Sequence, residues 1–314
     1  MASPRPNFFI VGAPKCGTTS LYSYLKEHPE VFMPDKKEPH YFCTDFYKPP
    51  RLTENQYLEL FASARDEKRI GEGSTWYIYS EEARRGIKAF DPEARIIIML
   101  RNPVAMMYSL HAQRLWLARE DIQDFEEALE AESDRKEGRR LPPYPFPVQL
   151  LFYRDCGKYS SHVSAYLDRF GSEQVKVVIF EEFARNTEAS YREICEFLEI
   201  DPHFKPEFAV HNSNKKLRST RVRRFLRNER TKDVGRWFPR RFRRSFKGFL
   251  LDVNTRKTTR PPMTASLRER LEREFQDEVE ATSKVVGKDL SRWWGPQGRV
   301  PADTASMHEA PSIP

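Results

Sequence analysis

The chain has 314 residues, of which 39% are hydrophobic and 13% aromatic, so it can bury a core and is not wholly disordered. Its 53 Lys and Arg residues outnumber 46 Asp and Glu residues, for a formal net charge of +7, but no apolar stretch is long enough to span a membrane and residues 1–7 lack the apolar part of a secretion signal. The four cysteines are scattered, which argues against a disulfide scaffold or a structural zinc site and favours a reduced, cytoplasmic protein.

Three short apolar runs, residues 8–11, 96–100 and 175–180, predict strands that are buried on both faces. Each run is followed by apolar residues at helical spacing, and another helix is expected over residues 158–170. This repeated order of strand, turn and helix predicts an α/β fold with a mainly parallel central sheet flanked by helices.

The later part of the chain is less regular. Residues 141–147 contain four prolines and are expected to form a loop. Apolar residues between Leu267 and Val286 predict one long amphipathic helix, and the composition of residues 296–314 predicts a disordered tail. We therefore expect a single domain over residues 1–295.

The positive charge is concentrated in one segment, residues 215–247, which holds fifteen Lys and Arg residues and two acidic residues. The rest of the chain is net negative as a consequence. We interpret the segment as a basic helical excursion with a solvated charged face and aromatic residues that dock it. The alternative is a weak contact with an acidic surface, such as a membrane, an acidic acceptor or a nucleic acid.

The most informative stretch begins where the first predicted strand ends in the turn Gly12–Pro14. The helix that follows opens with hydroxyl residues, and its first N–H groups and positive dipole end would face one spot. This predicts a site for an oxyanion, with Lys15 adding a point charge. The candidate contacts are Lys15, Cys16, Gly17, Thr18, Thr19 and Ser20.

The loop is not the P-loop of nucleotide triphosphatases, because Lys15 precedes Gly17 instead of following the second glycine. The second predicted strand also ends in Arg101, where magnesium-dependent enzymes would carry an aspartate. No metal site is therefore expected. Arg101 would lie at the carboxyl end of a parallel strand, where its planar guanidinium can hold a phosphate, and Ser109 would lie two turns into the next helix.

These two motifs carry a family resemblance. Residues 12–25, GAPKCGTTSLYSYL, resemble the 5'-phosphosulfate loop of sulfotransferases that use 3'-phosphoadenylyl sulfate (PAPS), and residues 101–109, RNPVAMMYS, resemble their 3'-phosphate motif. The resemblance extends more weakly over residues 8–294 and is nearest to carbohydrate-type and bacterial members. It implies a P-loop-like sulfotransferase fold, PAPS as donor and 3'-phosphoadenosine 5'-phosphate (PAP) as product, without naming the acceptor.

Sulfuryl transfer needs a base for the acceptor's proton and a cation for the charge that develops on the departing phosphate. Lys15 is the candidate cation. Residues 37–42, KEPHYF, resemble the Lys-Glu-x-x-x-Phe segment of glycan sulfotransferases, which implies that Glu38 is the base. His40 and His111 are the reserves for that role. Contacts with the acceptor are expected from Lys37, His40, Trp76 and His111.

Residues 71–77, GEGSTWY, resemble the next family segment, in which glycosaminoglycan enzymes commonly carry a lysine after the glutamate. Gly73 stands at that position here, which leaves a neutral glycan, a lipid or a small metabolite open as acceptor. Trp76 could stack on the acceptor or pack in the core. The resemblance also implies a late basic loop near the donor's 3'-phosphate, with Lys215, Lys216 and Arg218 as candidates.

The sequence therefore predicts a PAPS-dependent sulfotransferase that acts by in-line displacement on a hydroxyl or amine of a glycan, lipid or small molecule. Two alternatives stay open. A nucleotide-dependent phosphotransferase would need magnesium and ATP. A non-catalytic nucleic-acid-binding protein would use the basic segment 215–247, although no nucleic-acid partner is expected from the motifs.

Overall fold

The computed structural model describes residues 4–47, 52–143, 147–209, 215–217, 255–257 and 261–295. These residues fall into two compact units. The first holds the described residues of Met1–Met107, Arg154–Asn212 and Ala265–Val300, and the second those of Tyr108–Tyr153 and Ser213–Thr264. The predicted tail over 296–314 and most of the basic segment lie outside the described residues.

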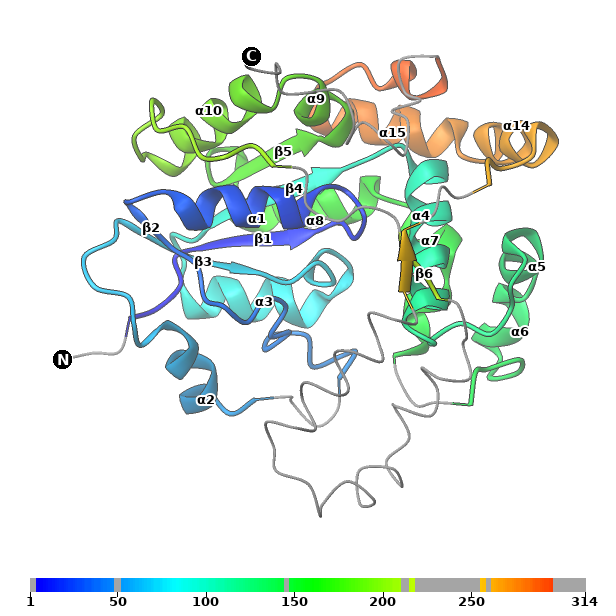
Figure 1. Cartoon of the computed structure of the whole chain (residues 1–314), viewed down its shortest axis with the longest axis horizontal. Coiled ribbons are helices and arrows are strands. Elements are labelled where there is room, and N and C mark those ends of the chain that lie inside the picture. Colours follow the sequence, from blue (N-terminus) through cyan, green and yellow to red (C-terminus); the bar gives the residue numbers. More distant parts are fainter. Residues whose placement is uncertain are drawn as a thin grey trace, which may run out of the picture. The chain divides into compact units, whose positions relative to one another are not determined.

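The first unit is built on a sheet of five parallel strands in the order β2-β3-β1-β4-β5 (Figure 1). The strands are β1 (Phe8–Gly12), β2 (Val31–Phe32), β3 (Arg69–Gly73), β4 (Arg95–Leu100) and β5 (Val175–Ile179). Every residue of β1 is buried, because this strand lies in the middle of the sheet and under helices on both sides. The parallel sheet expected from the apolar runs is confirmed, and β2 and β3 are additions that the sequence did not predict.

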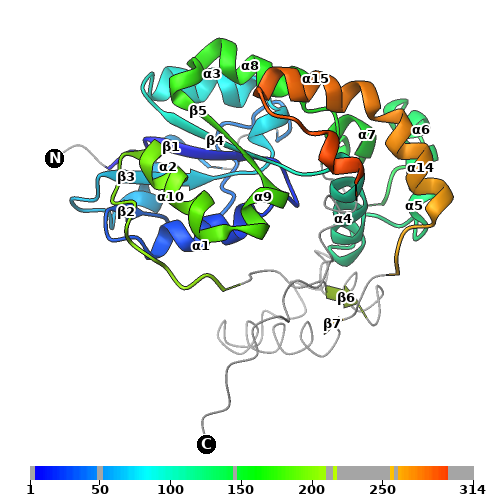
Figure 2. The ribbon, with the colours of Figure 1, turned by 90° about the horizontal axis from the view of Figure 1, so that it is seen from above.

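Helices cover both faces of this sheet, as Figure 2 shows. On one face lie α1, α9 and α10; on the other lie α3 and α8, with α15 packed against α8. The helices that run through the first unit are α1 (Thr18–Glu27), α2 (Glu54–Leu58), α3 (Glu81–Phe90), α7 (Tyr153–Cys156), α8 (Ser160–Phe170), α9 (Phe180–Arg185), α10 (Thr187–Leu198), α14 (Ala265–Glu274) and α15 (Gln276–Val286), with 3₁₀ turns at Glu59–Phe61, Tyr77–Tyr79, Ser172–Gln174 and Ser291–Trp294. This layering places the carboxyl ends of β1, β4 and β5 at one edge of the sheet.

The one long helix expected between Leu267 and Val286 is two helices, α14 and α15, which meet at Phe275. Backbone hydrogen bonds continue across the break, from Phe275 N–H to the Leu271 carbonyl at 3.0 Å and from Val279 N–H to the Phe275 carbonyl at 2.9 Å. The ring of Phe275 lies directly on Gly157, where an added Cβ would come within 2.7 Å of it. The bend is therefore set by packing against the turn before α8, which the apolar spacing of the sequence does not reveal.

The second unit contains most of α4 (Pro103–Trp116), which begins in the first unit, together with α5 (Phe125–Glu130), α6 (Glu132–Lys136) and a 3₁₀ turn at Val148–Leu151. Its interior is organised by a fully buried ion pair, in which Arg135 Nη2 lies 2.7 Å from Glu120 Oε1. The Tyr153 hydroxyl donates to the other carboxylate oxygen of Glu120 at 2.7 Å. Removing one partner would leave a buried charge unpaired, so this pair ties the helices of the unit together.

Two short antiparallel strands, β6 (Lys215–Leu217) and β7 (Thr255–Lys257), complete the described part of the second unit. The first three residues of the predicted basic helical excursion are thus a strand, and the rest of residues 215–247 lies outside the described residues. Across the described ranges, no helix combines the length and the apolar character that crossing a membrane requires.

Candidate active site

The phosphate loop, residues 13–17, links the central strand β1 to α1 and is tied to the neighbouring strand, because Ala13 N–H donates to the Met99 carbonyl at 2.6 Å. Lys15 and Gly17 both adopt left-handed backbone conformations, with φ of 64° and 88°. Gly17 is the N-cap of α1 and offers no side-chain cap, and the first turn of α1 contains no acidic residue. The positive end of this helix is therefore available to an anion.

Phe180, the residue directly after β5, packs against the phosphate loop. A Cβ added to Gly17 would lie 2.8 Å from its ring, so a glycine is required there by space as well as by conformation. The guanidinium carbon of Arg101, which follows β4, lies 4.6 Å from the centre of the same ring. The segments that follow β1, β4 and β5 therefore meet around Phe180.

Arg101 reaches the phosphate loop directly, and its Nη1 donates to the Lys15 carbonyl at 3.3 Å. Its Nε is buried and has no hydrogen-bond partner within the described ranges. A buried guanidinium N–H without an acceptor is costly, so this group is suited to an anionic oxygen from a ligand. The motif that begins at Gly12 and the motif that begins at Arg101 thus lie side by side. A donor that carries a 5'-phosphosulfate and a 3'-phosphate would require this arrangement.

Asn102 holds the end of β4 in place from behind. Its side-chain oxygen caps α4 by accepting from Ala105 N–H at 3.0 Å, and its side-chain amide donates to the Trp293 carbonyl at 2.7 Å. The Asn102 N–H and the Trp293 indole donate to the two oxygens of Glu181, at 3.1 Å and 2.9 Å. Burial raises the pKa of Glu181 despite these hydrogen bonds.

Sequence reasoning missed Phe180, Glu181 and Trp293 as supports of this site. A signal was present for Glu181, because it follows the third predicted strand, residues 175–180, as Arg101 follows the second. Trp293 is 191 residues away from its partner Asn102, and no local pattern announces that contact.

The loop that carries Glu38 is fastened to the end of β3. Glu38 N–H donates to the Gly73 carbonyl at 3.0 Å, and His40 N–H donates to Ser74 Oγ at 3.1 Å. Glu38 and His40 both have positive φ, 59° and 53°, which non-glycine residues adopt only when their surroundings enforce it. The Thr75 hydroxyl donates to Glu38 Oε1 at 3.1 Å, so the carboxylate is held at both its backbone and its side chain.

The Glu38 carboxylate is 39% exposed, and His40 Nε2 lies 3.6 Å from its Oε2. Burial raises the pKa of Glu38, but the interactions with His40, the charge of Lys37 and the hydrogen bond from Thr75 outweigh it and lower that pKa to about 2. Glu38 is therefore ionised at neutral pH and can accept a proton. His40 is 4% exposed and stacks on Tyr47, so it serves as a partner of Glu38 more readily than as an exposed contact for an acceptor.

Glu72 lies on β3 behind this loop and is fully buried. The hydroxyls of Tyr57 and Tyr77 both donate to its Oε2, at 2.8 Å and 3.0 Å. Burial raises the pKa of Glu72 to about 7, because neutral hydroxyls compensate only part of the lost hydration. Tyr77 also accepts a hydrogen bond from Phe42 N–H at 3.2 Å, so Glu72 helps to position the Glu38 loop.

Lys37 joins this loop to the first turn of α1, which follows the phosphate loop. Its Nζ donates to Thr19 Oγ1 at 2.9 Å and lies 3.5 Å from Thr18 Oγ1. The structure thus brings the phosphate loop, Arg101 and the segment Lys37–His40 together in the first unit. The Lys37 ammonium lies against the first turn of α1, and the contact expected between Lys37 and the acceptor stays a prediction.

Two expected contacts are buried. The Cys16 side chain is fully buried and its thiol donates to the Pro14 carbonyl at 3.4 Å, while burial raises the pKa of that thiol. Only the backbone of Cys16 can therefore contribute to an anion site. Trp76 is 3% exposed and its ring packs against Tyr79, with 5.6 Å between the ring centres. This burial favours the core-packing alternative for Trp76 over stacking on an acceptor.

Other expected site residues belong to the second unit or lie outside the described residues. Ser109 is half-buried on α4 in the second unit. His111 is buried there as well, with its Nε2 3.0 Å from the Ile122 carbonyl and its ring against Phe125 and Tyr153, so it contributes to the interior of that unit. The backbones of Lys215 and Lys216 lie in β6, and Arg218 is outside the described residues. The roles expected for these residues stay predictions.

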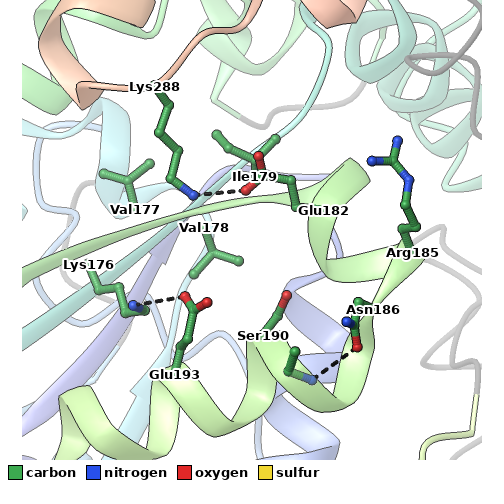
Figure 3. A pocket seen from close by; sticks show the side chains of 11 residues that line it. Lys176, Val177, Val178, Ile179, Glu182, Arg185, Asn186, Ser190, Glu193 and Lys288 are labelled. Carbon is green, nitrogen blue, oxygen red and sulfur yellow. Dashed lines mark hydrogen bonds and ion pairs between the residues drawn. The ribbon is translucent and has the colours of Figure 1, made fainter.

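A cavity of about 230 Å³ lies elsewhere in the first unit, beside β5 (Figure 3). It contains none of the expected site residues. Its lysines already have partners, since Lys288 donates to Glu182 at 2.8 Å and Lys176 lies 3.4 Å from Glu193. Because these lysines are paired with carboxylates, they offer little electrostatic attraction to an anionic ligand.

Comparison with known proteins decides the family. A family model described as the sulfotransferase domain matches residues 5–283. The chain belongs to the sulfotransferase family. A crystal structure of a sulfotransferase from Alicyclobacillus acidocaldarius is 31% identical, with a TM-score of 0.69, and the match covers 92% of this chain and 99% of that one. The bacterial sulfotransferase therefore shares the fold over nearly its whole length.

Among curated relatives, mouse carbohydrate sulfotransferase 15 is 28% identical in an alignment that covers 63% of this chain and 44% of that protein. Human heparan sulfate glucosamine 3-O-sulfotransferase 6 is 33% identical over 110 residues, which are 35% of this chain and 31% of that protein. The chain thus spans less than half the length of these curated relatives. Family membership confirms the expected enzyme class, a transferase of sulfuryl groups, over the phosphotransferase and nucleic-acid-binding alternatives.

Proposed function

We propose that this sulfotransferase takes PAPS as its donor, releases PAP, and transfers the sulfuryl group to a hydroxyl of a glycan or a small molecule. The family match and the names of the curated relatives, which act on carbohydrate and on heparan sulfate glucosamine, support this class of acceptor. Gly73, where glycosaminoglycan enzymes commonly carry a lysine, is the feature of this chain that keeps less charged acceptors within the proposal.

The observation that carries the proposal is the contact between Arg101 and the phosphate loop. Arg101 Nη1 donates to the Lys15 carbonyl, and the buried Nε of the same guanidinium has no acceptor among the described residues. The N–H groups at the start of α1 would hold the 5'-phosphosulfate. Arg101 would hold the 3'-phosphate, and the contact expected from Ser109 stays a prediction from the sequence.

The chemistry assigned to the residues follows from their charges. When bound, the donor supplies a sulfuryl group already linked to a good leaving group, its 5'-phosphate. Glu38, ionised because its pKa is lowered to about 2, takes the proton of the acceptor hydroxyl as the acceptor oxygen bonds to sulfur. The bond between sulfur and the bridging phosphate oxygen breaks, and Lys15 with the loop N–H groups stabilises the charge left on that oxygen. No metal is part of the proposal.

Thermal unfolding with nucleotides tests the donor site. PAP at about one hundred times its Kd should stabilise the protein by about 2.7 kcal/mol, and 5'-AMP, which lacks the 3'-phosphate, should do so far less. Arg101→Ala should remove the difference between the two ligands. Arg185→Ala, which changes the separate cavity beside β5, is the matched control and should keep it. Equal stabilisation of the unmodified protein by PAP and 5'-AMP would contradict the assignment.

Acceptor class is then settled with radiolabelled PAPS offered to separate pools of glycans, phenols, lipids and amines. We expect label to appear in the glycan or small-hydroxyl pools. Label confined to the amine pool would overturn the proposed acceptor while leaving the donor site intact.

A further inference from the structure

Gly73 lies at the end of β3, and the space in front of it is filled. A Cβ added there would meet Tyr22 Cδ2 at 2.9 Å, Tyr22 Cε2 at 3.3 Å and Lys37 Cε at 3.7 Å. The Tyr22 ring is fixed in this position, since its hydroxyl donates to the Pro34 carbonyl. The stem of Lys37 therefore passes through the space into which a side chain from position 73 would project.

The ammonium of Lys37 ends at the start of α1. Its Nζ donates to Thr19 Oγ1 at 2.9 Å, lies 3.5 Å from Thr18 Oγ1, and is 5.5 Å from the centre of the Tyr22 ring. Both threonines belong to the first turn of α1, whose N–H groups point toward the expected 5'-phosphosulfate site. The ammonium thus lies where its charge can act on an anion bound at that helix end.

This placement brings several positive groups to one helix end. The N-terminal end of α1 already carries the positive end of the helix dipole, Lys15 is part of the same loop, and the first turn of α1 has no acidic residue to offset them. Glu38 is the carboxylate beside Lys37 in sequence, but its own oxygens face Thr75 and His40. The charge of Glu38 offsets that of Lys37 in part, and a doubly charged phosphosulfate would offset the remaining positive charge.

On these contacts we propose that Lys37 is a second catalytic cation, whose ammonium moves from the hydroxyls of Thr18 and Thr19 onto the sulfuryl oxygens of the donor and stabilises them during transfer. Lys37 thereby supplies from the Glu38 loop the positive charge that the strand end at Gly73 lacks. The inference rests on the proposed function, since it names a further residue of the same reaction.

The protonation behaviour of Lys37 is consistent with this role and offers a readout. Burial lowers the pKa of Lys37 to about 8, although the charge of Glu38 opposes that shift. The titratable groups that surround Lys37 are Glu38 on its own loop and Tyr22 on α1. The ammonium is therefore present in the free protein at neutral pH and is lost as the pH rises above about 8.

The first test compares Lys37→Met with Lys36→Met, a matched control at the neighbouring exposed lysine. Because removal of one group that stabilises transition-state charge typically costs a hundredfold or more, Lys37→Met should lower kcat by about a hundredfold. Stabilisation by PAP, which has no sulfuryl group, should be kept, and Lys36→Met should change neither quantity. Turnover of Lys37→Met within about threefold of the unmodified protein would overturn the inference.

The second test is the pH profile of Lys37→Arg, which also covers the case in which Lys37→Met does not fold. In the unmodified protein, kcat/KM for PAPS should fall as pH rises above about 8, and in Lys37→Arg the fall should move beyond about pH 10 because arginine stays charged. The same alkaline fall in both proteins would overturn the inference while leaving the proposed function in place. Absence of any PAP stabilisation in the unmodified protein would instead overturn the proposed function, and the role of Lys37 with it.

Discussion

The loop that carries Glu38 and the strand end that carries Glu72 are joined by a backbone hydrogen bond. The pKa values of the two carboxyl groups are nevertheless shifted in opposite directions. Burial raises the pKa of both groups. Glu38 also has a lysine and an imidazole beside it, and its pKa is lowered to about 2. Glu72 accepts hydrogen bonds only from neutral hydroxyls and is repelled by the charge of Glu38, so its pKa is raised to about 7. Glu38 is thus ionised and exposed to an acceptor, whereas Glu72 is fully buried, so exposure together with charged partners distinguishes the two carboxyl groups.

The largest expected effect is a difference in kcat between variants of Glu38 and Glu72. Glu38→Gln should lower kcat by at least about a hundredfold with little change in the stabilisation by PAP, because it removes the proton acceptor and leaves the phosphate loop unchanged. Glu72→Gln, in which a neutral amide replaces a group that is already partly protonated at pH 7, should keep kcat within about threefold. Steady-state kinetics of the two variants check this, and an equal loss in both would show that the comparison is mistaken.

A smaller effect should appear in the pH dependence of stability. Because the folded pKa of Glu72 is raised above its usual 4.5 to about 7, the stabilisation from its proton is complete below pH 4.5 and is lost as pH rises through 7. Glu72→Gln should remove that decline, which is on the order of 3 kcal/mol, as measured by urea unfolding at several pH values. Parallel curves for the variant and the unmodified protein would argue against it.

Glu38 should contribute with the opposite sign, since its folded pKa is lowered from 4.5 to about 2. Its contribution is present above pH 4.5 and is lost as pH falls toward 2. The group is 39% exposed, so solvent screening keeps this change smaller than that of Glu72.

The smallest expected effect comes from the hydroxyl donors of the two carboxyl groups. Tyr57→Phe removes a hydrogen bond to Glu72 and should lower the free energy of unfolding by about 1 kcal/mol without changing turnover. Thr75→Val removes the hydrogen bond to Glu38 and should lower kcat about fivefold with little loss of stability. Urea unfolding and initial rates of both variants check this. A loss of turnover in Tyr57→Phe, or a loss of stability without a loss of turnover in Thr75→Val, would contradict the prediction.

The central part of the fold was predictable because its strands are continuous apolar runs that lie between two layers of helices. The two strands on one side of β1, β3 and β2, were not predicted. β3 has the sequence RIGEG, in which an arginine, two glycines and a glutamate conceal a strand that is buried toward its end, and β2 has only two residues. Their positions depend on pairing with β1 and with each other, which is tertiary information.

The candidate site was predictable where a strand end coincides with a distinctive motif, as at Lys15 and Arg101. Three features could not be inferred from the residues alone. Glu38 and His40 adopt left-handed conformations that no glycine marks, the lysine stem in front of Gly73 comes from another segment, and Trp293 reaches Asn102 from the far end of the chain. Each depends on how segments distant in sequence pack together.

The hydrogen bond between Asn102 and Trp293 has a consequence for the order of events on the ribosome. Synthesis produces the phosphate loop and Arg101 early, but the support behind Arg101 is missing until residue 293 has emerged. The nascent chain can therefore assemble its sheet long before its donor site is complete. The support behind Arg101 is thus completed only after every strand of the five-stranded sheet has been synthesised.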